Sequence, residues 1–251
     1  MGAARGQGRS HAVRLAEEGA DIIVVTLMEP IDSVRYPLAV PGNLDETVAL
    51  VEALDRRILA RRVDVRSQAG LDEAVAEGLA AFGHIDIVCA NEGIASFGST
   101  WELPEATWQE MIEINLTRVW RSVKAAGPSM IEAARGGSTV LVSSVAGLKG
   151  LASIGQYVAA KYGMVGLMRP LANELGRHSI RVNTVHTTNV PTPVVLNDVT
   201  LRAFRQDFAD PSEADILESM TGMQAIPNPM GRPDRHLRRH PLVWVRRVSL
   251  R

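Results

Sequence analysis

Residues 2–26 read GAARGQGRSHAVRLAEEGADIIVVT, a glycine-rich loop followed by a helical pattern and a short β-branched run. The glycines have the spacing G-x-x-x-G-x-G, and the apolar residues from 12 to 16 recur at helical spacing. A glycine loop that leads into a helix presents backbone N–H groups and the positive end of the helix dipole to a pyrophosphate. A simple turn has the same composition, so both interpretations stay open for the loop alone. The candidate cofactor-binding residues in this loop are Gly2, Arg5, Gly6, Gln7 and Gly8.

Strand and helix patterns alternate along the rest of the chain. The predicted strands are residues 21–26, 58–64, 85–90, 138–142 and 180–185, and the predicted helices are residues 46–54, 70–82, 104–126 and 154–177. This alternation predicts an α/β fold, with a doubly wound parallel (Rossmann-like) sheet in a single domain. The ligand of such a sheet binds beyond the carboxyl ends of the strands. The residues at that edge are the glycine loop, Asp64, Asn91, Ser144 and the segment 183–192.

The stretch SSVAGLKGLASIGQYVAAK at 143–161 carries the candidate catalytic chemistry. Tyr157 and Lys161 are four residues apart, so on a helix they lie on one face, and Ser144 is thirteen residues upstream of Tyr157. These three side chains can hold one substrate oxygen and move its proton. A free tyrosine has a pKa of about 10, and a nearby ammonium is expected to lower it toward the range of a useful base. An ordinary amphipathic helix with one exposed lysine contains the same pair. The chain has only three lysines, however, so a lysine at this position favours the catalytic interpretation.

The composition bounds the class of protein. The 251 residues are enough for one α/β domain and short for two. Cys89 is the only cysteine, which indicates a reducing compartment such as the cytoplasm. We see no signal peptide and no run that approaches the length of a membrane span, so we expect no membrane association. No metal site is predicted.

The chain up to about residue 229 resembles the short-chain dehydrogenase/reductase family. The matching residues are GAARGQG at 2–8, Asp64 with Val65, Asn91 with Gly93, Asn115, Ser144, Tyr157 with Lys161, and 183–192. The long connection MEPIDSVRYPLAVPGNLDETV at 28–48 is similar to a mycofactocin-associated, carveol-dehydrogenase-like subgroup. The resemblance implies tightly held NAD, a secondary alcohol or ketone as the small-molecule substrate, a homotetramer and a mycofactocin redox partner.

The resemblance also implies a role for each matching residue. In the family pattern Tyr157 is the general acid/base and Ser144 binds the substrate oxygen. Lys161 binds the nicotinamide ribose and lowers the tyrosine pKa, Asn115 holds a water in a proton relay, and Thr192 contacts the carboxamide. The implied cofactor contacts are Gly2, Arg5, Gly6, Gln7, Gly8, Asp64, Val65, Asn91, Gly93, Tyr157, Lys161, Val190 and Thr192.

Several positions depart from the family pattern. Met1 stands where a strand precedes the glycine loop, so we expect the first strand of the sheet to be missing. Thr26 replaces the Asp that grips the adenine ribose in NAD-preferring members, which weakens NAD binding and makes NADP an alternative cofactor. Glu92 places a carboxylate beside the adenine ribose and phosphate, where we expect it to be unfavourable. Thr187 replaces a turn proline. Pro170 lies inside a predicted helix, where it either costs about 3 kcal/mol of stability or is tolerated as a kink.

The resemblance ends abruptly after Asn228-Pro229. Residues 231–251 contain seven Arg and one Asp, where the family continues with an acidic helix and a final strand. We therefore expect an incomplete dehydrogenase domain over 1–229, without its last strand, and an unrelated Arg-rich tail over 230–251. The sharp change favours a shifted reading frame over a genuine basic arm. Nucleic acid is the least favoured partner, because few aromatic residues interleave with the arginines.

The sequence therefore predicts an NAD(P)-dependent oxidoreductase that transfers a hydride between a nicotinamide cofactor and a secondary alcohol or ketone, with Tyr157 as the acid/base. The alternative is a degenerate or truncated, non-catalytic relative with impaired cofactor binding. Residues 96–101 and a lid over 190–223 are expected to set the substrate shape.

Overall fold

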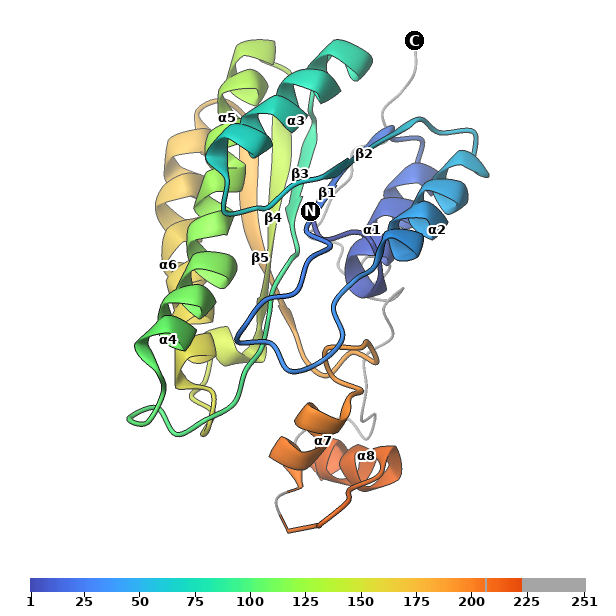
Figure 1. The fold of residues 1–251 in the computed structure, drawn as a ribbon. Helices are drawn as coiled ribbons and strands as arrows, with labels where there is room; N and C mark the ends of the chain where they lie inside the picture. The colour runs from blue at the N-terminus through green and yellow to red at the C-terminus, as the bar shows by residue number, and fades with distance from the viewer. Residues whose placement is uncertain (206, 223–251) are drawn as a thin grey trace.

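The computed structural model describes residues 1–205 and 207–222, in which strands and helices alternate as predicted (Figure 1). The strands are β1 (Ile22–Thr26), β2 (Ile58–Arg62), β3 (Ile87–Ala90), β4 (Gly137–Ser144) and β5 (Ile180–Thr187). The helices are α1 (Gly6–Glu17), α2 (Pro41–Glu52), α3 (Gln68–Phe82), α4 (Glu105–Ile112), α5 (Arg118–Ala133), α6 (Gly155–Gly176), α7 (Asp198–Phe204) and α8 (Glu213–Gly222). Two short helical segments are η1 (Glu113–Thr117) and η2 (Val145–Gly147).

All strand pairs of the described residues are parallel, which confirms the doubly wound α/β architecture. The strands form two hydrogen-bonded groups, β1–β2 and β3–β4–β5. No ladder joins β1 to β3 within the described part of the chain. Instead the Met1 amine donates to the Cys89 carbonyl and the Gly2 N–H donates to the Val25 carbonyl, both at 2.8 Å. Met1 and Gly2 thus lie between the two groups, where the sequence predicts that a strand is missing.

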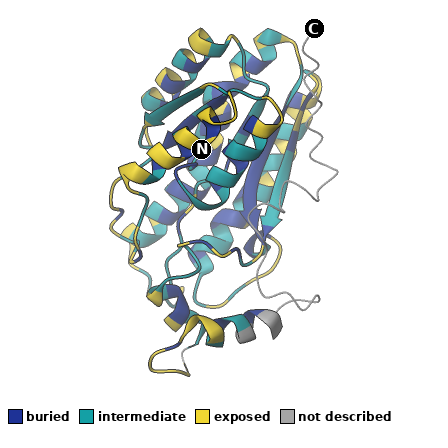
Figure 2. Ribbon diagram, turned by 90° about the vertical axis from the view of Figure 1, so that its right-hand side faces the viewer, coloured by how far each residue is buried: buried dark blue, intermediate teal, exposed yellow. Residues whose placement is uncertain are grey.

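Helices cover both faces of the strands (Figure 1). α3, α5 and α6 lie on one face and α1 and α2 on the other. The largest apolar cluster lies between β3–β5 and the helices α5 and α6, and its centre contains the fully buried Val119, Leu141 and Met164. Figure 2 shows the buried strands beneath helices whose outer faces are exposed. No helix in residues 1–205 and 207–222 combines the length and apolar character that crossing a membrane requires.

The predicted helix over 104–126 is both longer and interrupted. It consists of α4, the π-helical η1 and α5, which continues to Ala133. Asn115 lies in the π-helical segment, where its side chain bonds backbone groups of neighbouring segments. A helical pattern of apolar residues does not distinguish an α turn from one π turn, so this break was not predictable from periodicity.

Other boundaries differ for local reasons. α2 begins at Pro41, five residues before the predicted start, because proline suits a first turn and the Asn43 side chain accepts a bond from the Val40 N–H at 3.1 Å. β5 runs on to Thr187, which lies opposite Ser144, because threonine has the backbone N–H that proline lacks. Pro170 lies inside α6 without ending it, so the helix tolerates the proline.

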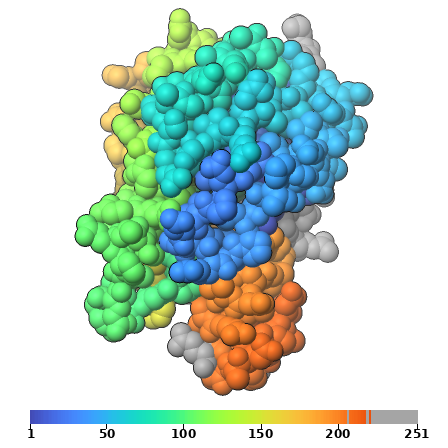
Figure 3. All heavy atoms as spheres, viewed as in Figure 1, coloured from blue at the N-terminus to red at the C-terminus, as the bar shows by residue number. Residues whose placement is uncertain are grey.

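The long connection over residues 27–40 lies across the carboxyl end of the strands. Its Ile31 packs against Ile94, Met111 and Ile114. In the space-filling view this connection occupies the middle of the molecule, between the α4 region and the α7–α8 pair (Figure 3). The predicted boundary near residue 229, the missing last strand and the Arg-rich tail lie outside the described residues.

Candidate active site

A pocket opens beyond the carboxyl ends of the strands, and it collects nearly all of the predicted site residues. Those that line it are Gly2, Arg5, Gly6, Gln7, Asp64, Val65, Asn91, Gly93, Ser144, Tyr157, Lys161, Val190 and Thr192. Gly8 and Asn115 do not line it, and both are buried. The sequence prediction of a single site at this edge of the sheet therefore agrees with the geometry.

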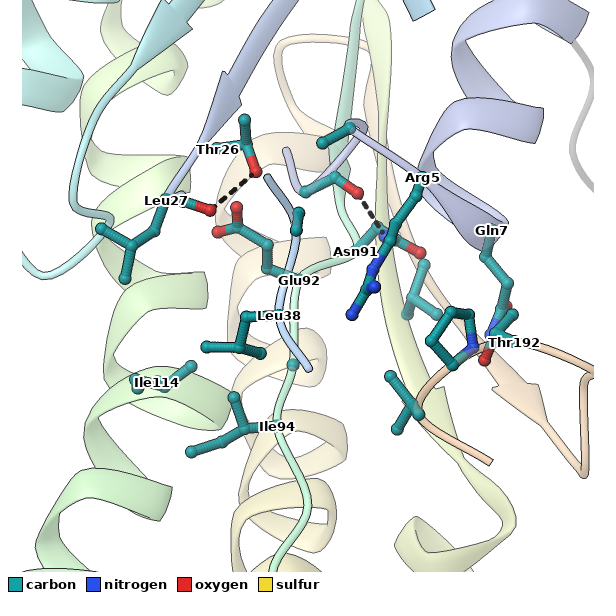
Figure 4. A pocket seen from close by; sticks show the side chains of 18 of the residues that line it. Arg5, Gln7, Thr26, Leu27, Leu38, Asn91, Glu92, Ile94, Ile114 and Thr192 are labelled. Atoms are coloured by element: carbon teal, nitrogen blue, oxygen red, sulfur yellow. Dashed lines mark hydrogen bonds between the residues drawn. The ribbon is translucent and has the colours of Figure 1, made fainter. Parts of the chain in front are cut away.

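The glycine loop forms one wall because side chains cannot fit there. Gly2 and Gly6 have positive φ angles of +67° and +58°, which residues with a side chain rarely adopt. A Cβ atom at Gly8 would lie 1.9 Å from the Gly2 carbonyl oxygen. The Asn91 side-chain amide donates to that same carbonyl at 3.3 Å (Figure 4). The loop thus forms a cradle of bare backbone beside the pocket.

The N-terminus of α1 adds polar groups to this wall. Its N-cap residue, Arg5, makes no side-chain capping bond, and Gly6 and Gln7 of the first turn line the pocket. The Gln7 Oε1 atom is buried without a hydrogen-bond partner among the described residues. N–H groups at a helix N-terminus bind phosphate oxygens, and an unpaired amide oxygen accepts a bond from a ligand donor. These residues therefore fit a dinucleotide.

Ser144, Tyr157 and Lys161 meet on the opposite side of the cradle. Ser144 ends β4, and Tyr157 and Lys161 lie one turn apart on α6. The Ser144 hydroxyl oxygen accepts a bond from the Ala146 N–H at 3.2 Å, and this hydroxyl group acts on Tyr157 by lowering its pKa. The Lys161 Nζ atom donates to the Val142 carbonyl at 2.9 Å and lies 5.4 Å from the centre of the Tyr157 ring. All three side chains line the same pocket and can act on one oxygen atom.

Burial has the largest effect on the pKa values of Tyr157 and Lys161. Burial raises the pKa of Tyr157 to about 12, which outweighs the lowering by the Ser144 hydroxyl. Burial, followed by repulsion from Arg118, lowers the pKa of Lys161 to about 7. The expectation that the nearby lysine lowers the tyrosine pKa is therefore not met by the chain alone. Desolvation penalises the charged forms of both side chains, and it is the largest cause of both pKa changes.

Asn115 supports the site from behind the pocket wall. Its Oδ1 atom accepts a bond from the Ile94 N–H at 3.2 Å, and its Nδ2 atom donates to the Ile94 and Met111 carbonyls at 3.1 and 3.2 Å. A Cβ atom at Gly93 would lie 2.7 Å from Asn115 Oδ1 and 3.7 Å from Lys161 Nζ. Asn115 thus holds the backbone after β3 close to Lys161.

Glu92 and Arg118 form an ion pair beside the pocket. Arg118 is fully buried, and its Nη1 atom lies 3.5 Å from Glu92 Oε2. Burial raises the pKa of Glu92, an effect that Arg118 and the Met1 amine oppose, and burial lowers the pKa of Arg118. Arg118 of α5 and the Met1 amine thus reduce the cost of the buried carboxylate at position 92, but the effect of burial is larger.

Two residues that the sequence reasoning missed help to shape the site. Arg118 is one, although its position three residues after Asn115 placed it on the same inward helical face. Tyr36 of the 27–40 connection is the other. It is 5 % exposed, and its hydroxyl group accepts a bond from the Ala95 N–H at 3.1 Å. Nothing in the local pattern indicated that this connection folds over the site.

The chain matches known proteins over most of its length. A family model described as short chain dehydrogenase matches residues 1–200. The (-)-trans-carveol dehydrogenase of Rhodococcus erythropolis is 47 % identical over 91 % of this chain and 83 % of its own length. The crystal structure of carveol dehydrogenase from Mycobacterium avium in complex with NAD has a TM-score of 0.91 and 47 % identity, and covers 92 % of this chain and 84 % of that chain. A short chain dehydrogenase from Mycobacterium paratuberculosis bound to NAD has a TM-score of 0.83 and 39 % identity, with coverage of 92 % and 84 %.

Fold and pocket together define an oxidoreductase of the Rossmann type, in which a cradle of backbone faces a serine, a tyrosine and a lysine. With the family match over residues 1–200, the chain belongs to the short-chain dehydrogenase family. The protein is an NAD-dependent enzyme that transfers a hydride between the cofactor and the CH–OH group of an alcohol.

Proposed function

We propose that this protein oxidises secondary alcohols, or reduces the corresponding ketones, with Tyr157 as the general acid/base. The observation that carries the proposal is that Ser144, Tyr157 and Lys161 line one pocket together with the glycine loop, with the Lys161 Nζ atom 5.4 Å from the centre of the Tyr157 ring. The bound cofactor supplies or accepts the hydride at its nicotinamide ring. Ser144 holds the substrate oxygen, Tyr157 takes or gives its proton, and Lys161 stabilises the phenolate.

The remaining predicted residues have proposed roles in cofactor binding. Gly2, Gly6 and Gly8 shape the loop for the pyrophosphate, with Arg5 and Gln7 beside it. Val190 and Thr192 line the pocket, and Thr192 packs against the loop, since a Cβ atom on Gly6 would lie 3.3 Å from the Thr192 Cγ2 atom. The residues proposed to receive the adenosine half are Asp64, Val65, Asn91 and Gly93. Asn115 is proposed to hold a water of the proton relay in addition to its backbone bonds.

An apolar substrate fits the part of the pocket beside Tyr157. Ile94 and Ile114 line this part together with Leu38 of the long connection. Such a surface favours a hydrocarbon skeleton, and the carveol dehydrogenase relatives act, by their names, on a cyclic terpenoid alcohol. We therefore propose a cyclic, apolar secondary alcohol as the substrate.

The cellular setting of this activity is also proposed. The similarity of residues 28–48 to the mycofactocin-associated subgroup supports a mycofactocin redox partner, and the single cysteine supports a cytoplasmic location. A homotetramer is supported by Trp120 on α5 and Tyr162 on α6, each 45 % exposed, because exposed aromatic residues often mark contacts between chains. Light scattering in solution tests the assembly, and a monomeric mass would contradict it.

A panel of alcohols tests the proposed function. The protein is mixed with NAD and with pairs of secondary and primary alcohols on the same cyclic skeleton, and reduced cofactor is followed by absorbance. We expect reduction with the secondary alcohols. Equal rates with both members of each pair would contradict the assignment of substrate class.

A non-catalytic relative is the second candidate. The separation of β1 from β3 among the described residues favours it, because the glycine loop depends on that region for its position. Calorimetric titration with NAD separates the candidates. Binding followed by alcohol oxidation supports the enzyme. Weak or absent NAD binding, or binding without oxidation of any alcohol in the panel, supports the non-catalytic protein.

A further inference from the structure

The end of β1 lacks the charge that dinucleotide sites usually have there. In Rossmann-type folds an acidic residue about 20 positions after the glycine loop bonds the adenosine ribose hydroxyl groups. Thr26 occupies this place, is 3 % exposed and lines the pocket. Its hydroxyl group donates to the Leu27 carbonyl at 3.3 Å. Thr26 therefore offers the ribose no carboxylate.

A carboxylate from another strand reaches the same place. Glu92 follows β3, and its side chain lines the pocket together with Thr26 and Leu27. Figure 4 shows the Glu92 carboxylate directed toward Thr26 and Leu27. A Cβ atom at Gly2 would lie only 2.2 Å from Glu92 Cγ, so the side chain passes directly over the glycine loop. The acidic group thus lies between the loop and the end of β1.

Arg118 positions this side chain and leaves part of it available. The guanidinium donates to the Ile114 carbonyl at 2.8 Å and to the Glu92 backbone carbonyl. Its contact with the Glu92 carboxylate is a single approach of Nη1 to Oε2 at 3.5 Å. The other carboxylate oxygen, Oε1, is therefore not held by Arg118. The fixed guanidinium instead limits the rotamers of Glu92.

The other two carboxylates that line the pocket, Asp64 and Glu29, pair with arginines that are more exposed than Arg118. Asp64 Oδ1 and Oδ2 both accept from Arg66 Nε, at 3.0 and 2.9 Å. Glu29 pairs with Arg62 at 3.0 Å, and both of these side chains are more than half exposed. Only 15 % of the Glu92 side chain is exposed, and its partner Arg118 is fully buried. Hydrogen bonds in such a desolvated site are stronger than at the surface.

We infer that Glu92 replaces the missing acidic residue of β1: it binds the adenosine ribose hydroxyl groups of NAD and rejects the 2′-phosphate of NADP. This inference rests on the cofactor site of the proposed function and deepens it. A carboxylate accepts bonds from the ribose hydroxyl groups, whereas a phosphate at the 2′ position is repelled by it. The weak discrimination expected from Thr26 alone is therefore replaced by a preference for NAD.

The test uses calorimetric titration of the 251-residue chain with NAD and with NADP, in the absence of substrate. Glu92→Gln keeps the shape of the side chain and removes its charge. We expect the Kd for NAD to rise about tenfold or more and the Kd for NADP to change by less than about threefold or to fall. The matched control is Glu113→Gln, which breaks the pair with Arg121 outside the pocket and should leave both Kd values unchanged.

A second variant keeps the test informative if Glu92→Gln destabilises the fold. Glu92→Gln leaves Arg118 buried without its counter-charge, so the unfolding temperature of each variant is measured first. If it falls strongly, Arg118→Met in the Glu92→Gln background removes the buried charge, and the same change in the two Kd values is expected. Adding Thr26→Asp to Glu92→Gln should restore the preference for NAD, because it returns a carboxylate to the end of β1.

The outcomes separate this inference from the proposed function. If Glu92→Gln weakens NAD and NADP equally, or if Glu113→Gln has the same effect, the role of Glu92 in ribose recognition is wrong while the cofactor site stands. If the unmodified chain binds neither nucleotide, both the cofactor site and the inference are overturned.

Discussion

At the scale of single residues, the site combines a tyrosine and a lysine, and burial disfavours the charged form of each side chain. The pKa of Tyr157 is raised to about 12 and that of Lys161 is lowered to about 7, in each case mainly by burial. Burial therefore disfavours the charged form of each of these two groups in the folded chain. This balance leads to a stability effect that depends on pH.

We expect the unfolding temperature, measured without nucleotide, to rise between about pH 7 and pH 9 because of Lys161. The lysine pKa is about 7 in the folded chain against an ordinary value of 10.5. Between these values the unfolded chain binds more protons, so the free energy of unfolding increases with pH. Tyr157 does not interfere, because its pKa lies above its ordinary value of 10.0. Lys161→Met should reduce this rise to the part below about pH 8 that comes from the buried Met1 amine, whose pKa lies below its ordinary value of 8.0. Equal pH slopes in the two proteins would contradict the buried lysine.

Lys161→Arg should abolish alcohol oxidation although it keeps the charge. The Lys161 Nζ atom already bonds the Val142 carbonyl at 2.9 Å, and a Cβ atom on Gly93 would lie within 3.7 Å of it. A longer guanidinium overfills this space, at a cost of about 1–3 kcal/mol. The matched control is Lys124→Arg on the exposed side of α5, which should retain activity. An active Lys161→Arg protein would show that the lysine tip is not confined.

The residue patterns predicted the members of the site better than their electrostatics. Ser144, Tyr157 and Lys161 meet in one pocket as their spacing indicates. The raised tyrosine pKa could not be predicted, because desolvation depends on the packing of segments far apart in the chain. The partnership of Glu92 with Arg118 was missed for the same reason, since their contact spans 26 positions.

At the scale of elements, the glycine loop and α1 form the most tightly constrained part of the pocket. Gly8→Ala should abolish nucleotide binding, because the new methyl group would lie 1.9 Å from the Gly2 carbonyl oxygen and displace the loop. The matched control is Gly42→Ala in α2, where a Cβ atom has no neighbour within 4 Å. This control should bind nucleotide normally and be slightly more stable, since alanine favours a helix by up to about 1 kcal/mol. Calorimetric titration checks both variants, and unchanged binding by Gly8→Ala would contradict the cradle.

Sequence periodicity predicted the identity and order of the elements and missed their interruptions. The strands β1 to β5 each fall within or over a predicted run, because a buried parallel strand is a short apolar segment. The π-helical η1 was not predicted, because it depends on the Asn115 side chain bonding Ile94 across the pocket wall. Such tertiary bonds have no signature in the spacing of apolar residues.

At the scale of the whole molecule, the described strands form two groups that meet only through Met1 and Gly2. A strand of about six residues added before Met1, with a β-branched pattern, should pair with both β1 and β3 and raise the unfolding temperature. Each new pair of bonds satisfies backbone groups that otherwise cost about 1–3 kcal/mol when buried without a partner. Thermal unfolding of the extended and unmodified proteins measures the gain.

A Gly/Ser extension of the same length is the control for this prediction. It has little strand propensity and should leave the unfolding temperature unchanged. An equal effect of both extensions, or no effect of the strand-forming one, would mean that β1 and β3 do not accept a strand between them.

The central claim is that the pocket oxidises a secondary alcohol through Tyr157. The most direct test is a single-turnover reaction, in which NAD-loaded protein is mixed with excess secondary alcohol and the appearance of reduced cofactor is timed. We predict that the unmodified chain reduces its bound NAD and that Tyr157→Phe does so at least about 100-fold more slowly while binding NAD equally well. Reduction at the same rate in both proteins would contradict the account.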